Sequence, residues 1–221
     1  MLYGKICNKK MDAYLKVNKV LSYTKTQFNE VLIAIIESFG KCLIINNHLE
    51  TSFVEYIPYH ESLIPKFKPF EDQKVLLLGC GTGIAINTLI SRGWKNITAL
   101  DRDHQLIELC AAHFSDFNNN IYNKQDLFTL KIEDALTYLK STDEECYDYV
   151  ILDISSPEII AKKEEYISEI HRILTKNGLF SFNDYNKYDM SYFANDVLKY
   201  FTRFKPRYQT ILDYRLGHIQ K

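Results

Sequence analysis

Short apolar runs alternate with amphipathic segments from residue 74 onward. Apolar runs of strand length predict strands at 74–78, 96–100, 127–132, 147–153 and 178–183. The segments between and after them have helical spacing and predict helices at 84–92, 103–115, 133–140, 162–175 and 188–200. Strands that alternate with helices form a parallel sheet covered on both faces. The pattern therefore predicts an α/β fold, Rossmann-like, with a mostly parallel, doubly wound sheet.

The chain before residue 74 is built differently. Its β-branched and aromatic runs predict strands at Lys19–Tyr23, Phe28–Ser38 and Lys41–Ile45, and Asn46-Asn47 predicts a hairpin turn. The segment Phe53–Pro65 then leads into the core through two prolines. We expect a small N-terminal β domain over residues 1–60 and a Rossmann-like domain over 61–221. After Pro206, the stretches Tyr208–Tyr214 and Gly217–Gln220 predict a closing antiparallel hairpin.

A glycine-rich loop follows the strand at 74–78. Its glycines permit a tight turn and close approach of a ligand to the backbone, and they are Gly79, Gly81 and Gly83. Asp101 ends the next strand, 22 residues after the first glycine, where a carboxylate can accept hydrogen bonds from both hydroxyls of a ribose. A dinucleotide site prefers G-x-G-x-x-G, whereas the order here, G-x-G-x-G, resembles the first motif of class I S-adenosylmethionine enzymes. The loop therefore predicts a nucleoside cofactor of that type.

Composition limits the partners and the compartment. The chain has 27 basic and 28 acidic residues and no basic stripe interleaved with aromatic residues, so we expect no nucleic-acid partner. Five cysteines without a C-x-x-C pair are typical of the reduced thiols of a cytoplasmic protein. The first residues lack a signal-peptide core, and no apolar run approaches the roughly 20 residues of a membrane span. We also expect no metal site, because the six histidines show no ligand spacing.

Six further segments, in order, resemble the spermidine synthase family of aminopropyltransferases. Three of them precede the glycine loop. Val20–Glu30 resembles the family's opening strand with its S-x-Y-Q element, and Phe39–Asn47 resembles its Y-G-x-x-L-x-L-D-G hairpin. Phe53–Glu61 lies where the family has its D-E-x-x-Y-H/Q-E segment. Those after the glycine loop are Ile132–Ala135 (G-D-G/A), Leu152–Pro157 (D-x-x-D-P) and Asp213–Ile219 (T-Y-P-S-G-x-I). The resemblance covers nearly the whole chain, and it implies a class I S-adenosylmethionine methyltransferase-like fold.

The resemblance implies a donor of the S-adenosylmethionine type, intact or decarboxylated, and assigns residues to it. Asp101 would hold the ribose, while Asp134 and the backbone of Ala135 would meet the edge of the adenine. Asn29 stands at the family's Gln position near the nucleoside. The glycine loop, with Thr82, would face the methionine-derived chain of the donor.

Tyr59, Asp153 and Tyr214 would border a small acceptor molecule, an amine among the candidates. Structural alternatives stay open for these residues. Asp153 could cap the following turn, and the two tyrosines could be packing aromatics. Asp134 could be a helix N-cap. His60 is interpreted as structural, because the family admits Gln at its position.

Two departures from the family pattern bear on the chemistry. Ser156 replaces the second Asp of D-x-x-D-P, which the resemblance implies is the base that deprotonates the acceptor amine. Thr82 replaces a loop Asp that would face the free ammonium of a decarboxylated donor. A serine hydroxyl has no useful basicity near neutral pH. These changes favour intact S-adenosylmethionine and transfer of an alkyl group, most simply methyl, to a small polar or amine acceptor that Asp153 orients.

Three alternatives remain. The chain could be a true aminopropyltransferase with an altered site, in which Asp153 or a carboxylate of the substrate replaces the missing base. It could instead be a catalytically silent homologue that binds a nucleoside or a partner protein, or it could act on the donor itself by lyase or cyclisation chemistry. The family resemblance also implies a homodimer or a larger homo-oligomer, for which the aromatic N-terminal strands would suit an interface.

Overall fold

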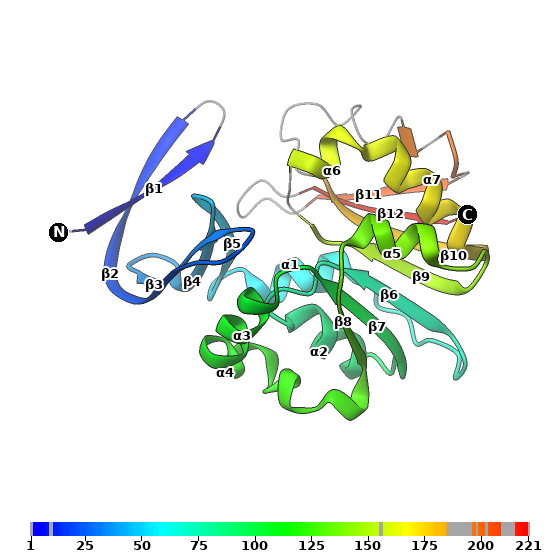
Figure 1. Cartoon of the computed structure of the whole chain (residues 1–221), viewed down its shortest axis with the longest axis horizontal. Helices are drawn as coiled ribbons and strands as arrows, with labels where there is room; N and C mark the ends of the chain where they lie inside the picture. Colours follow the sequence, from blue (N-terminus) through cyan, green and yellow to red (C-terminus); the bar gives the residue numbers. More distant parts are fainter. Residues whose placement is uncertain are drawn as a thin grey trace.

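The computed structural model describes residues 2–8, 11–154, 157–184, 196–197, 199–201, 203–208 and 215–220. Two sheets organise these residues, a five-stranded antiparallel sheet and a seven-stranded, mostly parallel sheet. The five-stranded sheet lies at one side of the larger one, with α1 between them (Figure 1). Within the described ranges, no helix is both long and apolar enough to cross a membrane.

The N-terminal sheet is a meander in which each strand pairs with the next along the chain. Its strands are β1 (Leu2–Asn8), β2 (Met11–Lys25), β3 (Glu30–Ile36), β4 (Gly40–Ile45) and β5 (His48–Ser52). Asn46 and Asn47 both have positive φ, 50° and 64°, and form the predicted two-residue turn between β4 and β5. The strand β1 was not predicted, and the predicted strand Phe28–Ser38 begins later, at Glu30.

The segment after β5 contains a helix that the sequence analysis missed, α1 (Tyr56–Leu63). Pro58 obscured the helix because proline usually breaks one. It is the third helical residue, where the missing N–H group would have no partner inside the helix in any case. The predicted domain boundary between residues 60 and 61 falls within α1. As a result, Tyr59 and His60 are held on a helix rather than on a loop.

The larger sheet has the strand order β11-β12-β10-β9-β6-β7-β8. Its strands are β6 (Lys74–Leu78), β7 (Asn96–Asp101), β8 (Thr129–Ile132), β9 (Tyr147–Leu152), β10 (Leu174–Asp184), β11 (Arg203–Tyr208) and β12 (Arg215–Gln220). The five strands from β6 to β10 pair in parallel, and β11 and β12 add an antiparallel hairpin. The predicted doubly wound α/β fold is therefore confirmed. The described residues include a closing antiparallel hairpin with β11 as its first strand, whereas all of the predicted strand Tyr208–Tyr214 except Tyr208 lies outside the described residues.

Helices follow most of the parallel strands. They are α2 (Ile84–Ser91), α3 (His104–His113), α4 (Ser115–Asn118), α5 (Ala135–Ser141), α6 (Pro157–Ala161) and α7 (Lys163–Ile173), with 3₁₀ turns η1 (Ile121–Asn123) and η2 (Gln125–Leu127). The predicted helices 84–92, 103–115, 133–140 and 162–175 correspond to α2, α3, α5 and α7. Most of the predicted helix 188–200 lies outside the described residues.

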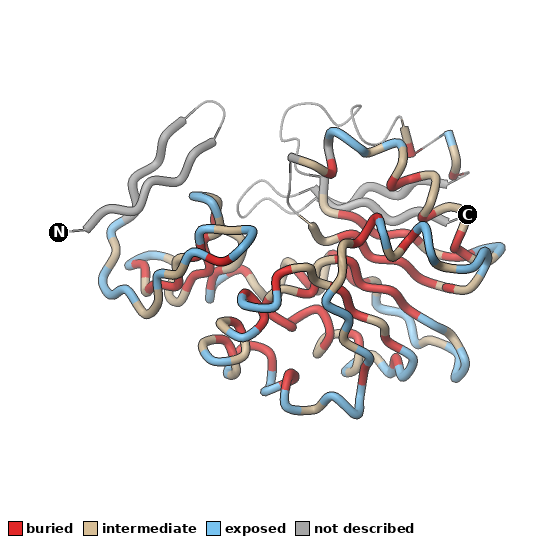
Figure 2. Tube along the Cα trace, in the orientation of Figure 1, coloured by how far each residue is buried: buried red, intermediate tan, exposed pale blue. Residues whose placement is uncertain are grey.

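The central strands β6 and β9 are buried on both faces (Figure 2). Alternate residues of β6 enter two separate clusters: Val75 and Leu77 pack with α2 and α3, whereas Leu76 and Leu78 pack with α5 and α7. The chain runs from β6 outward to β7 on one side and returns to β9 on the other side. In an open parallel sheet, such a switch point leaves a crevice at the carboxyl ends of the strands. The fold therefore predicts where the ligand site lies.

Replacing Leu77 with Ala should lower the free energy of unfolding by about 2–5 kcal/mol, because the removed atoms leave a cavity in the middle of the sheet. Leu77 is 0% exposed. Leu127→Ala is the matched control, since Leu127 is 39% exposed, and it should cost less than about 1 kcal/mol. Urea titration of the two variants measures the difference. Equal losses of stability would contradict this account of the core.

Candidate active site at the carboxyl ends of the parallel strands

A cavity of about 240 Å³ opens at the carboxyl ends of the central strands. Its wall contains most of the predicted site residues, namely Asn29, Tyr59, Gly79, Gly81, Thr82, Asp101, Asp134, Ala135 and Asp153. Gly83 precedes α2 just behind the loop. The predicted residues Ser156 and Tyr214 lie outside the described part of the chain. Segments that are far apart in the sequence thus meet at one crevice.

The glycine loop passes unusually close to the end of β9. Gly79 has φ of +86°, and a Cβ atom at this residue would lie 2.5 Å from the carbonyl oxygen of Asp153. Gly81 also has positive φ, +35°, but a Cβ there would meet nothing within 4 Å. At residue 79, both the positive φ and the lack of room for a Cβ atom therefore require glycine. At residue 81, only the positive φ favours glycine.

Two residues that the sequence analysis did not predict donate side-chain hydrogen bonds to carbonyl groups of this loop. The hydroxyl of Tyr122 donates a hydrogen bond to the carbonyl oxygen of Gly81 at 2.6 Å. The side-chain amide of Asn118 donates to the carbonyl oxygen of Thr82 at 2.7 Å. Both residues are buried, in the region between α3 and β8 where no element was predicted. These two hydrogen bonds restrain the carbonyl groups of Gly81 and Thr82 without any contribution from a ligand.

Asp101 ends β7 and is held by two backbone groups. The N–H of Gly81 donates to Oδ2 at 3.0 Å, and the N–H of Asp103 donates to Oδ1 at 3.1 Å. Burial raises the pKa of the Asp101 carboxyl, and these two hydrogen bonds oppose that rise. Each carboxylate oxygen retains a further lone pair that can accept a hydrogen bond from a ligand hydroxyl.

Asp134 is the N-cap of α5, so the structural alternative for this residue is correct. Its Oδ1 accepts from the N–H of Thr137 at 2.9 Å and from the hydroxyl of Thr137 at 3.1 Å. Asp134 also lines the cavity together with Ala135. The N-cap hydrogen bonds orient the Asp134 carboxylate, and Asp134 still lines the cavity.

Asn29 connects the N-terminal sheet to the larger sheet. Its amide group donates to Asp103 Oδ2 at 2.8 Å, and its carbonyl oxygen accepts from the amide of Asn46 at 2.9 Å. Asp103 in turn caps α3 by accepting from the N–H of Leu106 at 3.1 Å. Asn29 therefore has a positioning function in addition to lining the cavity, and its role near a nucleoside stays a prediction.

Asp153 and Tyr59 form the most chemically specific contact in the cavity. The hydroxyl of Tyr59, on α1, donates a hydrogen bond to Asp153 Oδ1. Asp153 itself follows β9, with its N–H bonded to the carbonyl oxygen of Leu78 at 2.8 Å. Burial raises the pKa of Asp153 to about 6, and the Tyr59 hydrogen bond lowers it in part. A carboxylate with a pKa near neutrality is suited to general-base chemistry.

His60, the neighbour of Tyr59, has a structural role. It is buried, and its Nδ1 lies 2.6 Å from the carbonyl oxygen of Tyr56, to which an N–H at that position donates. Burial lowers the pKa of His60 to about 4, so the ring is neutral at neutral pH. The structural interpretation of this residue agrees with its surroundings.

Several charged residues of the cavity wall were not predicted. They are Glu50, Arg102, Glu133 and Glu158. Arg102 and Glu133 directly follow β7 and β8, so their position at strand ends could have revealed them in the sequence. With Asp101, Asp134 and Asp153, the carboxylates outnumber the cationic groups among the described lining residues. This wall favours a positively charged ligand. In the described part of the chain, we find no group of three His, Cys, Asp or Glu residues that could hold a metal ion.

Family profiles match nearly the whole chain. The profile described as "Spermine/spermidine synthase domain" matches residues 57–220. The profile described as "Spermidine synthase tetramerisation domain" matches residues 1–52.

Curated relatives with similar sequences are polyamine aminopropyltransferases. The one from Pyrobaculum calidifontis is 29% identical over 177 residues, which is 75% of this chain and 60% of the relative. The one from Buchnera aphidicola subsp. Schizaphis graminum is 28% identical over 174 residues, which is 76% of this chain and 60% of the relative. The matches thus span about 60% of the length of these relatives.

Two solved structures share the fold. The spermidine synthase from Thermotoga maritima superposes with a TM-score of 0.88 at 17% identity, covering 100% of this chain and 80% of that one. A spermidine synthase in complex with the transition-state analogue AdoDATO gives the same TM-score at 16% identity and the same coverage. These structures confirm the class I S-adenosylmethionine methyltransferase-like fold.

The comparisons give the expectation of methyl transfer no support, because the matching profiles are named for spermine and spermidine synthases and the curated relatives for polyamine aminopropyl transfer. That expectation depended on the absence of a base, which was inferred from Ser156. The structure contains a half-buried carboxylate, Asp153, in the same cavity, and desolvation raises its pKa to about 6. The argument from Ser156 therefore does not exclude a reaction that needs a base.

Replacing Gly79 with Ala should lower the free energy of unfolding by about 2–4 kcal/mol, because it adds both left-handed strain and a clash with the Asp153 carbonyl. Gly81→Ala is the control with positive φ but free space, and it should cost about 1–2 kcal/mol. Urea titration compares their stabilities, and calorimetry with 5′-methylthioadenosine compares their nucleoside binding. If Gly81→Ala proved the more damaging to stability, the close approach at Gly79 would not be the dominant constraint.

Proposed function

Because the chain belongs to the spermine/spermidine synthase family, we propose that it is an aminopropyltransferase. It would move the 3-aminopropyl group of decarboxylated S-adenosylmethionine to a small amine. The observation that carries this proposal is the half-buried Asp153 carboxylate, bonded by Tyr59 and placed beside the glycine loop in one cavity. The protein named in the second solved structure holds a transition-state analogue, AdoDATO, which supports a donor of this type by analogy.

The donor would bind by its nucleoside first. Asp101 offers two carboxylate oxygens, prepositioned by backbone N–H groups, to the ribose hydroxyls. Asp134 and Ala135 would meet the adenine edge, and the glycine loop with Thr82 would face the aminopropyl chain. Thr82 is neutral, so the ammonium of that chain would depend on the other carboxylates of the wall for charge pairing.

The reaction requires the acceptor to attack as a neutral amine. An ammonium group would lose one proton to an oxygen of Asp153, and the nitrogen lone pair would attack the methylene carbon bonded to the sulfonium. The carbon–sulfur bond would break with its electron pair going to sulfur, which leaves neutral 5′-methylthioadenosine. Burial lowers the pKa of an amine and has raised that of Asp153 to about 6, so the two values approach each other.

Asp153 therefore takes the role that the family resemblance assigned to the position of Ser156. A serine hydroxyl could not accept this proton unaided. Tyr59 would hold the carboxylate in one orientation, so that its other lone pairs face the acceptor. Tyr214, at its predicted place beside the acceptor, stays part of the proposal.

The acceptor would be a small cationic amine. Glu50 and Glu133 add negative charge to the cavity wall beyond the groups that would bind the donor. This charge would attract a diamine and compensate its second ammonium group. A neutral or anionic acceptor would gain nothing from these residues.

We also propose that the protein works as a homo-oligomer. The tetramerisation profile over residues 1–52 supports this state. Large apolar side chains of the N-terminal sheet are partly exposed, including Val20 at 44% and Tyr23 at 64%. Burial of such side chains between copies of the chain would stabilise a symmetric assembly.

Calorimetric titration of the purified protein with decarboxylated and intact S-adenosylmethionine tests the donor. We expect tighter binding of the decarboxylated form, and release of 5′-methylthioadenosine when 1,4-diaminobutane is added. Asp153→Asn, a variant of equal size, should bind the donor normally but transfer about 10²–10⁴-fold more slowly. Preference for the intact donor, or full activity of the Asn variant, would overturn the proposal.

The pH dependence of kcat/KM should follow the ionisation of Asp153. Because the base must be ionised, the rate should fall as pH falls below about 6. The Tyr59 hydrogen bond lowers the pKa of Asp153, so Tyr59→Phe should raise that pKa and move the acid limb of the profile to higher pH. An unmoved limb, or one shifted to lower pH in the Phe variant, would show that another group is titrating.

A further inference from the structure

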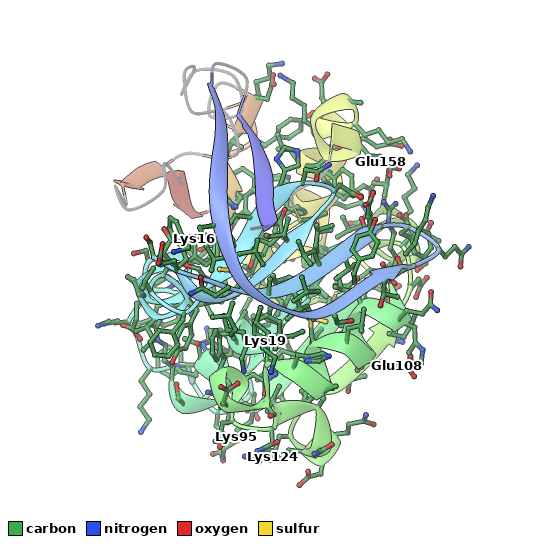
Figure 3. The ribbon with its side chains drawn as sticks, turned by 90° about the vertical axis from the view of Figure 1, so that its left-hand side faces the viewer. Lys16, Lys19, Lys95, Glu108, Lys124 and Glu158 are labelled. Atoms are coloured by element: carbon green, nitrogen blue, oxygen red, sulfur yellow. The ribbon has the colours of Figure 1, made fainter. Side chains whose placement is uncertain are left out.

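Three residues from distant parts of the chain meet at the wall of the cavity. They are Phe28 in the turn between β2 and β3, Arg102 immediately after β7, and Glu158 in the first turn of α6. Glu158, labelled in Figure 3, projects from the α6 side of the molecule. Arg102 is therefore the point where the N-terminal sheet, the larger sheet and α6 come together.

Two contacts restrain the guanidinium group of Arg102. Its Nη1 donates to Glu158 Oε2 at 2.9 Å, and its guanidinium carbon lies 5.0 Å from the centre of the Phe28 ring. The guanidinium group is planar and packs well on aromatic faces. An ion pair this exposed contributes little stability, because both side chains are 38% accessible to solvent. Its main physical consequence is to restrict the orientation of the guanidinium plane.

The position of Arg102 relative to the donor follows from the sheet. Asp101, which would bind the ribose, is the preceding residue, and it pairs in register with Ile132 at the end of β8. Asp134 and Ala135, which would meet the adenine edge, lie just after this strand. A base attached to a ribose on Asp101 and reaching toward Asp134 would have to pass alongside residue 102.

We propose, on the basis of the proposed nucleoside site, that Arg102 stacks on the face of the donor's purine ring. Glu158 and Phe28 keep the guanidinium plane in place for this contact. Asp134 would recognise the edge of the base, whereas Arg102 would recognise its aromatic face.

The positive charge of Arg102 does not oppose its proposed stacking on the purine ring of a cationic donor. Among the described lining residues, Arg102 is the one side chain that is always cationic, because His60 is neutral near pH 7. Glu158 pairs with Arg102, and the other carboxylates of the wall outnumber this one cation, so the wall as a whole does not repel a sulfonium donor. Glu158 also binds Lys162, whose Nζ lies 3.1 Å from the other carboxylate oxygen. Each oxygen of Glu158 thus has its own cationic partner.

The test is calorimetric titration with 5′-methylthioadenosine and 5′-methylthioinosine, which share a purine face but differ at the edge. Arg102→Met should weaken binding of both nucleosides by the same factor, about five- to tenfold, because it removes stacking. Arg102→Lys should weaken both as well, since it keeps the charge and loses the plane. Glu158→Gln should produce a smaller loss, about two- to threefold, by freeing the guanidinium.

Two matched controls separate this contact from others. Lys162→Met removes the other cation from Glu158 and should leave both affinities within about twofold. Asp134→Asn keeps a good N-cap but changes the edge contact, so it should alter the ratio of the two affinities. Thermal unfolding of each variant, expected to differ little from that of the unmodified protein, verifies the fold.

Unchanged affinity in Arg102→Met, full affinity in Arg102→Lys, or a loss confined to the adenine nucleoside would each overturn the inference. A protein that binds neither nucleoside would overturn both the inference and the donor site of the proposed function. Nucleoside binding that depends on Arg102 in a protein without aminopropyl transfer would support the inference and contradict the proposed reaction alone.

Discussion

The close approach of the glycine loop to the end of β9 is the constraint on which the rest of the site depends. The N–H of Asp153 bonds to the carbonyl of Leu78 at 2.8 Å, and a side chain at Gly79 would collide with the carbonyl oxygen of Asp153. This contact brings the glycine loop, proposed to face the donor, next to the Asp153 carboxylate, proposed to face the acceptor. A transfer reaction needs its two substrates within bonding distance, and the backbone itself provides that proximity.

Desolvation gives the site its chemistry. Partial burial raises the pKa of Asp153 to about 6, and the hydroxyl of Tyr59 orients the carboxylate. Tyr59 comes from α1, before the glycine loop in the chain, whereas Asp153 comes from the far side of the sheet switch point. The reactive pair therefore exists only when α1 is docked on the completed core.

The N-terminal sheet contributes directly to the cavity and is more than an appendage. Asn29 and Thr26 both donate to Asp103 Oδ2, at 2.8 Å and 2.6 Å, and Asp103 caps the helix after β7. The same turn supplies Phe28 to Arg102. Because Arg102 and Asp103 directly follow Asp101, movement of the N-terminal sheet would be transmitted to the carboxylate that is proposed to bind the ribose. The turn between β2 and β3 thus connects the N-terminal sheet to the wall of the cavity.

The sequence by itself determined the parallel core, the glycine loop and Asp101, because each depends on local patterns: a strand-length apolar run, the conformational freedom of glycine, and an acidic residue at a strand end. It did not determine α1, where local preference at Pro58 obscured a helix that tertiary packing stabilises. It also did not identify Tyr122 and Asn118 as supports of the loop. Asp153 was already a candidate base in the sequence, but its raised pKa and its bond to Tyr59 depend on the tertiary structure. The pKa of Asp153 depends on burial and on a tyrosine 94 residues away, and no local pattern encodes either.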